Sequence, residues 1–196
     1  MGIVRCNANR ILGVVIFCLY VGFIHGQAPG LVIQAGSSMA WVKDQQVTPE
    51  GYSHPGWAIS ADARLLDGSM YFLVGGQYHQ LQFYPVSGYA LKKGDWHLMM
   101  GRFGLGFDLA HISNLIVIRS KLLASINFNI TTPEGGIQTP TYETVNEAFF
   151  GATSGIGITI GFVDVDLEYQ YGIINAFYEK SDTKVNFLSL IAGFHF

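Results

Sequence analysis

The chain has 196 residues, a length that suits a single domain. Only 13% of its residues are charged, about half the share typical of globular domains, whereas 14% are aromatic and 24 residues are glycine. This composition indicates that part of the protein surface does not face water. The formal net charge of −3 provides no basic surplus, which argues against a nucleic-acid partner.

The first 26 residues have the organisation of a secretory signal peptide. Arg5 and Arg10 form a positive region, and residues 11–24 form an almost unbroken apolar run. We expect cleavage after Gly26, which leaves residues 27–196 as one mature domain. A membrane anchor is the alternative, but this run is shorter than the roughly 20 apolar residues that span a bilayer as a helix.

Both cysteines, Cys6 and Cys18, lie in this leader segment, so the mature domain contains no thiol. It can therefore form no disulfide and no thiolate metal site. Bulky Ile16 and Phe17 before Cys18 argue against a lipoprotein. No two histidines have a spacing that suggests a metal site, and we expect neither a metal nor a cofactor.

Alternation of apolar and polar residues with a period of two recurs eight times in the mature chain. Because a strand sends successive side chains to opposite faces, this pattern predicts eight strands. In chain order they cover about residues 31–42, 57–65, 70–81, 102–109, 116–130, 148–160, 163–171 and 184–196. No later segment reaches 18 consecutive apolar residues, so we do not expect a helical membrane protein.

The connections between these strands alternate between short and long. The short connections fall at about residues 66–69, 110–114 and 161–162, and the first contains Asp67-Gly68, a favoured hairpin turn. The long connections fall at about residues 43–55, 83–95, 131–147 and 176–183. Short periplasmic turns and long external loops are typical of bacterial outer-membrane barrels. An even number of strands places both termini in the periplasm.

A water-soluble barrel is the alternative, because its strands also alternate. The apolar faces here extend over nine or more residues, which matches a lipid crossing of about 9–11 residues. An eight-stranded barrel has an interior just wide enough for side chains, and the small residues of the polar faces suit that space. We therefore predict an all-β, eight-stranded antiparallel up-and-down transmembrane β-barrel.

Aromatic residues also fit such a barrel, because rings are enriched where a strand meets the lipid headgroups. The predicted girdle beside the long loops consists of Trp41, Trp57, Trp96, Phe149 and Phe177. The predicted girdle at the opposite end consists of Phe107, Phe162, Phe194 and Phe196.

The inward faces of the predicted strands collect charged side chains. An unpaired charge is costly in a low-dielectric interior, so these groups are expected to pair across the lumen. The predicted lumen charge cluster consists of Asp62, Arg64, Arg102, Asp108, Arg119, Lys121, Asp164, Asp166 and Glu168, and His79 faces the same way. A plug of ion pairs is the favoured interpretation, and a proton or ion path is the alternative.

The end of the chain resembles the C-terminal assembly signal of bacterial outer-membrane proteins. In that pattern a terminal aromatic residue is preceded by apolar residues at every second position. The matching residues here are Phe196, Phe194, Ala192, Leu190 and Leu188. The resemblance implies that the barrel-insertion machinery binds the chain during assembly.

Three segments resemble the PorT-like family of small outer-membrane barrels: Gly155–Ile160, Val163–Tyr169 and Gly193–Phe196. The resemblance implies a barrel embedded in outer-membrane lipid, and some members of the family act in secretion or gliding. These are strand patterns, so they carry over no functional residue.

We therefore expect a structural or accessory role, in which the outer loops are available to a protein partner. A narrow channel or solute sensor is one alternative, and a lipid A-modifying enzyme is another. The enzyme would need a hydroxyl nucleophile near a histidine and a carboxylate. His97 near Asp95 and His54 near Ser53 come closest, but no nucleophile motif surrounds them. We predict no catalytic residues.

Overall fold

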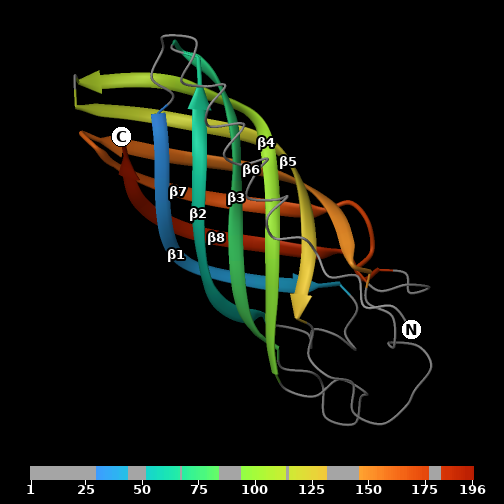
Figure 1. The fold of residues 1–196 in the computed structure, drawn as a ribbon. Helices are drawn as coiled ribbons and strands as arrows, with labels where there is room; N and C mark the ends of the chain where they lie inside the picture. The colour runs from blue at the N-terminus through green and yellow to red at the C-terminus, as the bar shows by residue number, and fades with distance from the viewer. Residues whose placement is uncertain are drawn as a thin grey trace, which may run out of the picture.

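The computed structural model describes residues 30–43, 52–66, 68–83, 94–113, 115–131, 146–176 and 182–196. The strands are β1 (Gly30–Val42), β2 (His54–Leu65), β3 (Met70–Phe83), β4 (Gly94–Ser113), β5 (Ile116–Thr131), β6 (Ala148–Ile160), β7 (Val163–Gly172) and β8 (Val185–His195). Each strand pairs antiparallel with the next, and β8 pairs with β1 to close the barrel (Figure 1). The predicted eight-stranded barrel is confirmed. The predicted signal peptide lies outside the described residues.

The two ends of the barrel differ. The three short hairpin turns lie at one end, together with the start of β1 and the end of β8, and we call this the turn end. There the N–H of Leu31 donates to the carbonyl of Phe196 at 3.0 Å, and the N–H of His195 donates to that of Phe162 at 3.1 Å. The long connections leave the other end, which we call the loop end. Within the described ranges, no helix is long and apolar enough to cross a membrane.

The largest departures from the predicted strand bounds are in β2 and β4. β2 begins at His54, inside the predicted first loop, and β4 occupies all of 94–113, including parts of two predicted connections. The alternation did not predict the start of β4, because the polarity of its two faces is reversed there. Trp96, Leu98 and Met100 point into the barrel, whereas Asp95 and His97 lie on the outward face. At its other end, β4 contains register shifts after Asp108 and His111, which blur the alternation.

The short turns adopt backbone conformations that favour glycine. Gly161, between β6 and β7, has a φ of 62°, and Gly68, between β2 and β3, has a φ of 142°. Leu66 also has a positive φ, of 76°. Asp67, the other residue of the predicted Asp-Gly turn, lies outside the described residues.

The barrel is apolar outside and polar inside over most of its height, the reverse of a water-soluble barrel. Ile156 and Leu122 on the exterior are each 61% exposed, whereas Asp166 and Glu168 inside are 2% and 3% exposed. An apolar exterior of this kind is stable against hydrocarbon, where polar groups on the lipid face are costly. The predicted inside-out arrangement is confirmed.

The predicted girdle at the loop end is wrong at two positions. Trp96 and Phe149 are buried inside the barrel, at 2% and 0% exposed, and so cannot contact lipid headgroups. Trp57 does face outward, and its ring lies 5.4 Å from that of Tyr78. Phe177 lies outside the described residues. At the turn end, Phe162 stacks on Phe194 with ring centroids 5.8 Å apart, and both rings are exposed.

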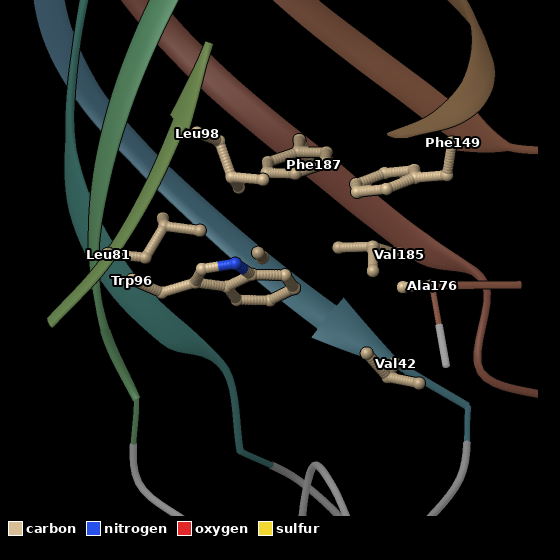
Figure 2. Close-up of a cluster of buried hydrophobic side chains, with 9 residues drawn as sticks. Val42, Leu81, Trp96, Leu98, Phe149, Ala176, Val185 and Phe187 are labelled. Atoms are coloured by element: carbon tan, nitrogen blue, oxygen red, sulfur yellow. The ribbon is translucent and has the colours of Figure 1, made fainter. Parts of the chain in front are cut away.

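The inward-facing aromatic residues form part of an apolar plug that fills the barrel at the loop end (Figure 2). It consists of Ala40, Val42, Leu81, Trp96, Leu98, Phe149, Ala176, Val185 and Phe187. The indole N–H of Trp96 donates to Asn129 Oδ1 at 2.8 Å, so the one polar atom of that ring is satisfied. Since an eight-stranded barrel has an interior about as wide as its side chains, this plug occupies the lumen where it approaches the loops.

Candidate functional site

Eight of the nine predicted lumen charges meet in one ion-pair cluster between the apolar plug and the turn end. The cluster consists of Asp62, Arg64, Arg102, Arg119, Lys121, Asp164, Asp166 and Glu168. Asp108 lies apart, at the edge of the turn end, where its carboxylate is 4.0 Å from His111 Nε2. The inward parity of β2, β4, β5 and β7 brings the eight residues together, because alternate positions of each strand face the lumen.

The layer nearest the turn end is built around Asp164, which is fully buried. Its carboxylate forms ion pairs with Arg64 and with Arg119 Nη2, the latter at 3.1 Å. The hydroxyl of Thr159 donates to it at 2.7 Å, and His195 Nδ1 lies 3.3 Å away. Four groups from four strands therefore surround one carboxylate, which satisfies a charge that would otherwise be costly to bury.

The middle layer is built around Asp166, one step further along the inward face of β7. Arg119 Nη2 lies 3.1 Å from Oδ1, and Lys121 Nζ lies 3.2 Å from Oδ2. The side-chain amide of Gln34 also donates to Oδ2, at 2.6 Å. Lys121 reaches Glu168 as well, so this layer connects directly to the next.

The layer nearest the plug is built around Arg102. Its guanidinium holds both carboxylate oxygens of Asp62, with Nε 2.8 Å from Oδ1. Nη1 donates to Glu168 Oε2 at 2.8 Å and to Gln77 Oε1 at 2.7 Å. Two-pronged pairing of arginine with a carboxylate is among the strongest hydrogen-bonded arrangements in proteins.

The cluster is balanced in charge, with four cations against four carboxylates. Each cation touches at least one carboxylate, so no member is left as an isolated buried charge. Removal of any one member would leave the charge of its partner uncompensated in a low-dielectric interior. The geometry is that of a packed plug.

Four further residues complete the cluster and were not among the predicted lumen residues: Gln34, Gln77, Thr159 and His195. Each lies on the inward parity of its strand, and that parity was the available indication. The sequence could not predict which residues pair across the lumen, since partners such as Gln34 and Asp166 are 132 residues apart. A small apolar cluster of Tyr71, Leu73 and Leu123 was also missed, and the guanidinium of Arg64 lies over the Tyr71 ring at 5.3 Å.

The residues considered for catalysis do not come together as a reactive set. His97 shares a hydrogen bond with the hydroxyl of Tyr78, while Asp95 accepts from Gln80 at 3.4 Å. His54 is buried at the start of β2. Within the described ranges, no group of three or more histidine, cysteine or acidic residues is arranged to hold a metal ion.

A serine–histidine contact does occur inside the lumen, where Ser38 Oγ lies 3.0 Å from His79 Nδ1. Ser189 Oγ lies 3.0 Å from the same hydroxyl, and Glu168 lines a cavity beside the histidine. That cavity admits the centre of a water molecule over only about 10 Å³. A space of this size cannot admit an acyl chain, so the contact lacks room for a lipid substrate.

No protein-family model matches the sequence, and no curated protein matches it. Among solved structures, Neisserial surface protein A (NspA) superimposes with a TM-score of 0.53 at 15% identity, over 85% of this chain and 96% of that chain. The fold is that of the small outer-membrane β-barrels. Ail, the attachment invasion locus protein of Yersinia pestis, solved in complex with the heparin analogue sucrose octasulfate, gives a TM-score of 0.45 at 16% identity, over 86% of this chain and 99% of that chain.

Proposed function

We propose that the chain is an integral protein of a bacterial outer membrane, with a structural or accessory role and outer loops that bind a protein partner. The observation that carries this proposal is a closed barrel whose exterior is apolar and whose lumen is filled. Such a barrel can fix loops at the cell surface without transporting anything itself. The signal peptide would direct export and be cleaved after Gly26, and the turn end with both termini would face the periplasm.

Membrane orientation is tested by labelling single cysteines in whole cells, which is possible because the mature chain has none. Glu147, at the loop end, and Ser69, at the turn end, are both exposed. We expect a membrane-impermeant maleimide to label Glu147→Cys in intact cells and Ser69→Cys only after the outer membrane is opened. If only Ser69→Cys were labelled in intact cells, the turn end would face the cell exterior and the proposed orientation would be wrong.

The filled lumen predicts that the pure protein forms no stable porin-sized pore in planar bilayers. Both the apolar plug and the ion-pair cluster would have to move before solutes could pass, and neither leaves space for a continuous water column. A general porin run in the same bilayers serves as the positive control. Reproducible large conductance steps from the pure protein would favour the narrow-channel alternative.

The C-terminal residues support a proposal about assembly. Leu190 and Phe194 are exposed on the outer face of β8, and Phe196 is exposed directly after it, where the barrel-insertion machinery could reach them. Deletion of Phe196 is expected to reduce heat-modifiable barrel in the outer membrane and to leave chain in the periplasm. Replacement of Phe196 by tyrosine keeps the terminal aromatic and should assemble normally. Equal assembly of the deletion and the tyrosine variant would contradict this role.

We propose more specifically that the chain belongs to the PorT-like family and has a role associated with secretion. The strand patterns of Gly155–Ile160, Val163–Tyr169 and Gly193–Phe196 support it. The test is a photo-crosslinking residue at Tyr52, which is 71% exposed at the loop end, with the same group at Ser69 as the control. Crosslinking of a secretion component from Tyr52 would support the role. Unchanged secretion in a strain lacking the protein would count against it.

A further inference from the structure

A small cavity separates the ion-pair cluster from the apolar plug. Glu168 of the cluster and Phe187 of the plug both line it, as do Gln77, His79 and Gln170. It admits the centre of a water molecule over about 10 Å³, which is close to the space that one water requires. The cavity is therefore too small for any occupant much larger than one water molecule.

The walls of this cavity carry five buried polar atoms without hydrogen-bond partners in the protein. They are Gln77 Nε2, His79 Nε2, Thr153 Oγ1, Gln170 Nε2 and Gln170 Oε1. All four side chains are at most 2% exposed. Leaving a buried donor or acceptor unpaired is costly, and most such groups in proteins are paired with protein or with ordered water.

The atoms offer both kinds of hydrogen-bonding group. The amide nitrogen of Gln77 can only donate, the side-chain oxygen of Gln170 can only accept, and the hydroxyl of Thr153 can do either. The amide of Gln77 is assigned independently, because its oxygen accepts from Arg102 at 2.7 Å, which leaves its nitrogen as the group that can donate to an occupant of the cavity. His79 is held by the contact of its Nδ1 with Ser38 at 3.0 Å, which leaves Nε2 for the cavity.

We propose that this cavity is a binding site for one ordered water molecule, which joins Gln77, His79, Thr153 and Gln170 across the lumen. A water makes two to four hydrogen bonds in such sites, and these four side chains supply at least that many complementary atoms. The water extends the hydrogen-bonded network of Arg102 up to the base of the apolar plug. It is thus a structural element of the lumen, held where the polar and apolar layers meet.

The proposal is tested by nuclear magnetic resonance on the full-length mature barrel in lipid nanodiscs. We expect the side-chain amide protons of Gln77 and Gln170 to show nuclear Overhauser cross-peaks to water. Their sign should be that of a water molecule that remains bound, and not that of rapidly exchanging surface water. Absence of such cross-peaks in the wild-type protein would overturn the proposal. So would a crystal structure in which the amides of Gln77 and Gln170 bond to each other and close the cavity.

Two variants at Thr153 locate the bound water. Thr153→Val replaces the hydroxyl by a methyl group of similar size, so the water keeps its other partners and the cross-peaks should persist. Their persistence would also show that they do not arise by transfer through the exchangeable hydroxyl proton of Thr153. Thr153→Ile adds one further methyl group and should cause loss of the cross-peaks by filling the space. Cross-peaks as strong in Thr153→Ile as in Thr153→Val would place the water elsewhere and overturn the proposal. Heat-modifiable migration confirms that each variant is folded.

Discussion

Replacing Leu167 by arginine should lower the free energy of unfolding in lipid vesicles by about 2–4 kcal/mol, the cost of a cation on the lipid face near the membrane midplane. Leu167 lies in the middle of β7 and is 43% exposed on the outside of the barrel. Its cross-strand partners, Ile156 on β6 and Leu190 on β8, are also exposed and apolar. The arginine would therefore have no nearby counter-charge on this face. Urea unfolding measured by tryptophan fluorescence provides the comparison.

The control for this prediction is Leu167→Ser, which shortens the side chain without adding charge. If the face contacts lipid, the arginine variant should be much less stable than the serine variant. Glu168→Leu, at the neighbouring inward position, tests the opposite face and should leave the protein in the membrane fraction. Equal stability of the arginine and serine variants would show that Leu167 does not face hydrocarbon, as would recovery of the wild-type protein in the aqueous fraction of washed membranes.

Replacing Arg102 by methionine should destabilise the barrel by about 3–5 kcal/mol, because removing one partner of a buried ion pair leaves uncompensated charge inside. Methionine keeps much of the side-chain length, so the loss is mainly of charge and hydrogen bonds. Asp62 would lose its two-pronged partner, while Glu168 would keep only Lys121. The measurement is the midpoint and slope of urea unfolding in the same vesicles.

Lys43→Met is the matched control for Arg102→Met. Lys43 pairs with Asp182 at 3.3 Å, but their side chains are 78% and 60% exposed. Such a surface pair contributes about 0–1 kcal/mol, so this variant should unfold almost like the wild type. Adding Asp62→Asn to Arg102→Met should restore part of the lost stability, since it removes the carboxylate charge that Arg102 no longer neutralises. If both single variants had equally small effects, the lumen would be well hydrated and the cluster would not act as a packed plug.

The sequence alone determined the number of strands, their order and which side chains of most strands face inward. It could do so because strand alternation is a local property: every second residue faces the same side wherever the strand lies. In β7, for example, the polar residues Asp164, Asp166 and Glu168 and the apolar residue Leu167 fall on opposite faces without reference to any other strand. The strands that were delimited poorly were those where this local contrast fails.

Only the tertiary structure decided how the lumen is filled. The first half of β4 carries Trp96, Leu98 and Met100 on its inward face and Asp95 and His97 on its outward face, the reverse of the pattern in β7. Polarity alone therefore could not distinguish Trp96 in the lumen from a ring at the membrane interface. The partners across the lumen were also undetermined, because closing the barrel sets the stagger that brings Gln34 of β1 to Asp166 of β7. Alternation assigns each side chain to the inside or the outside, whereas the stagger of the closed barrel sets its height and therefore its neighbours.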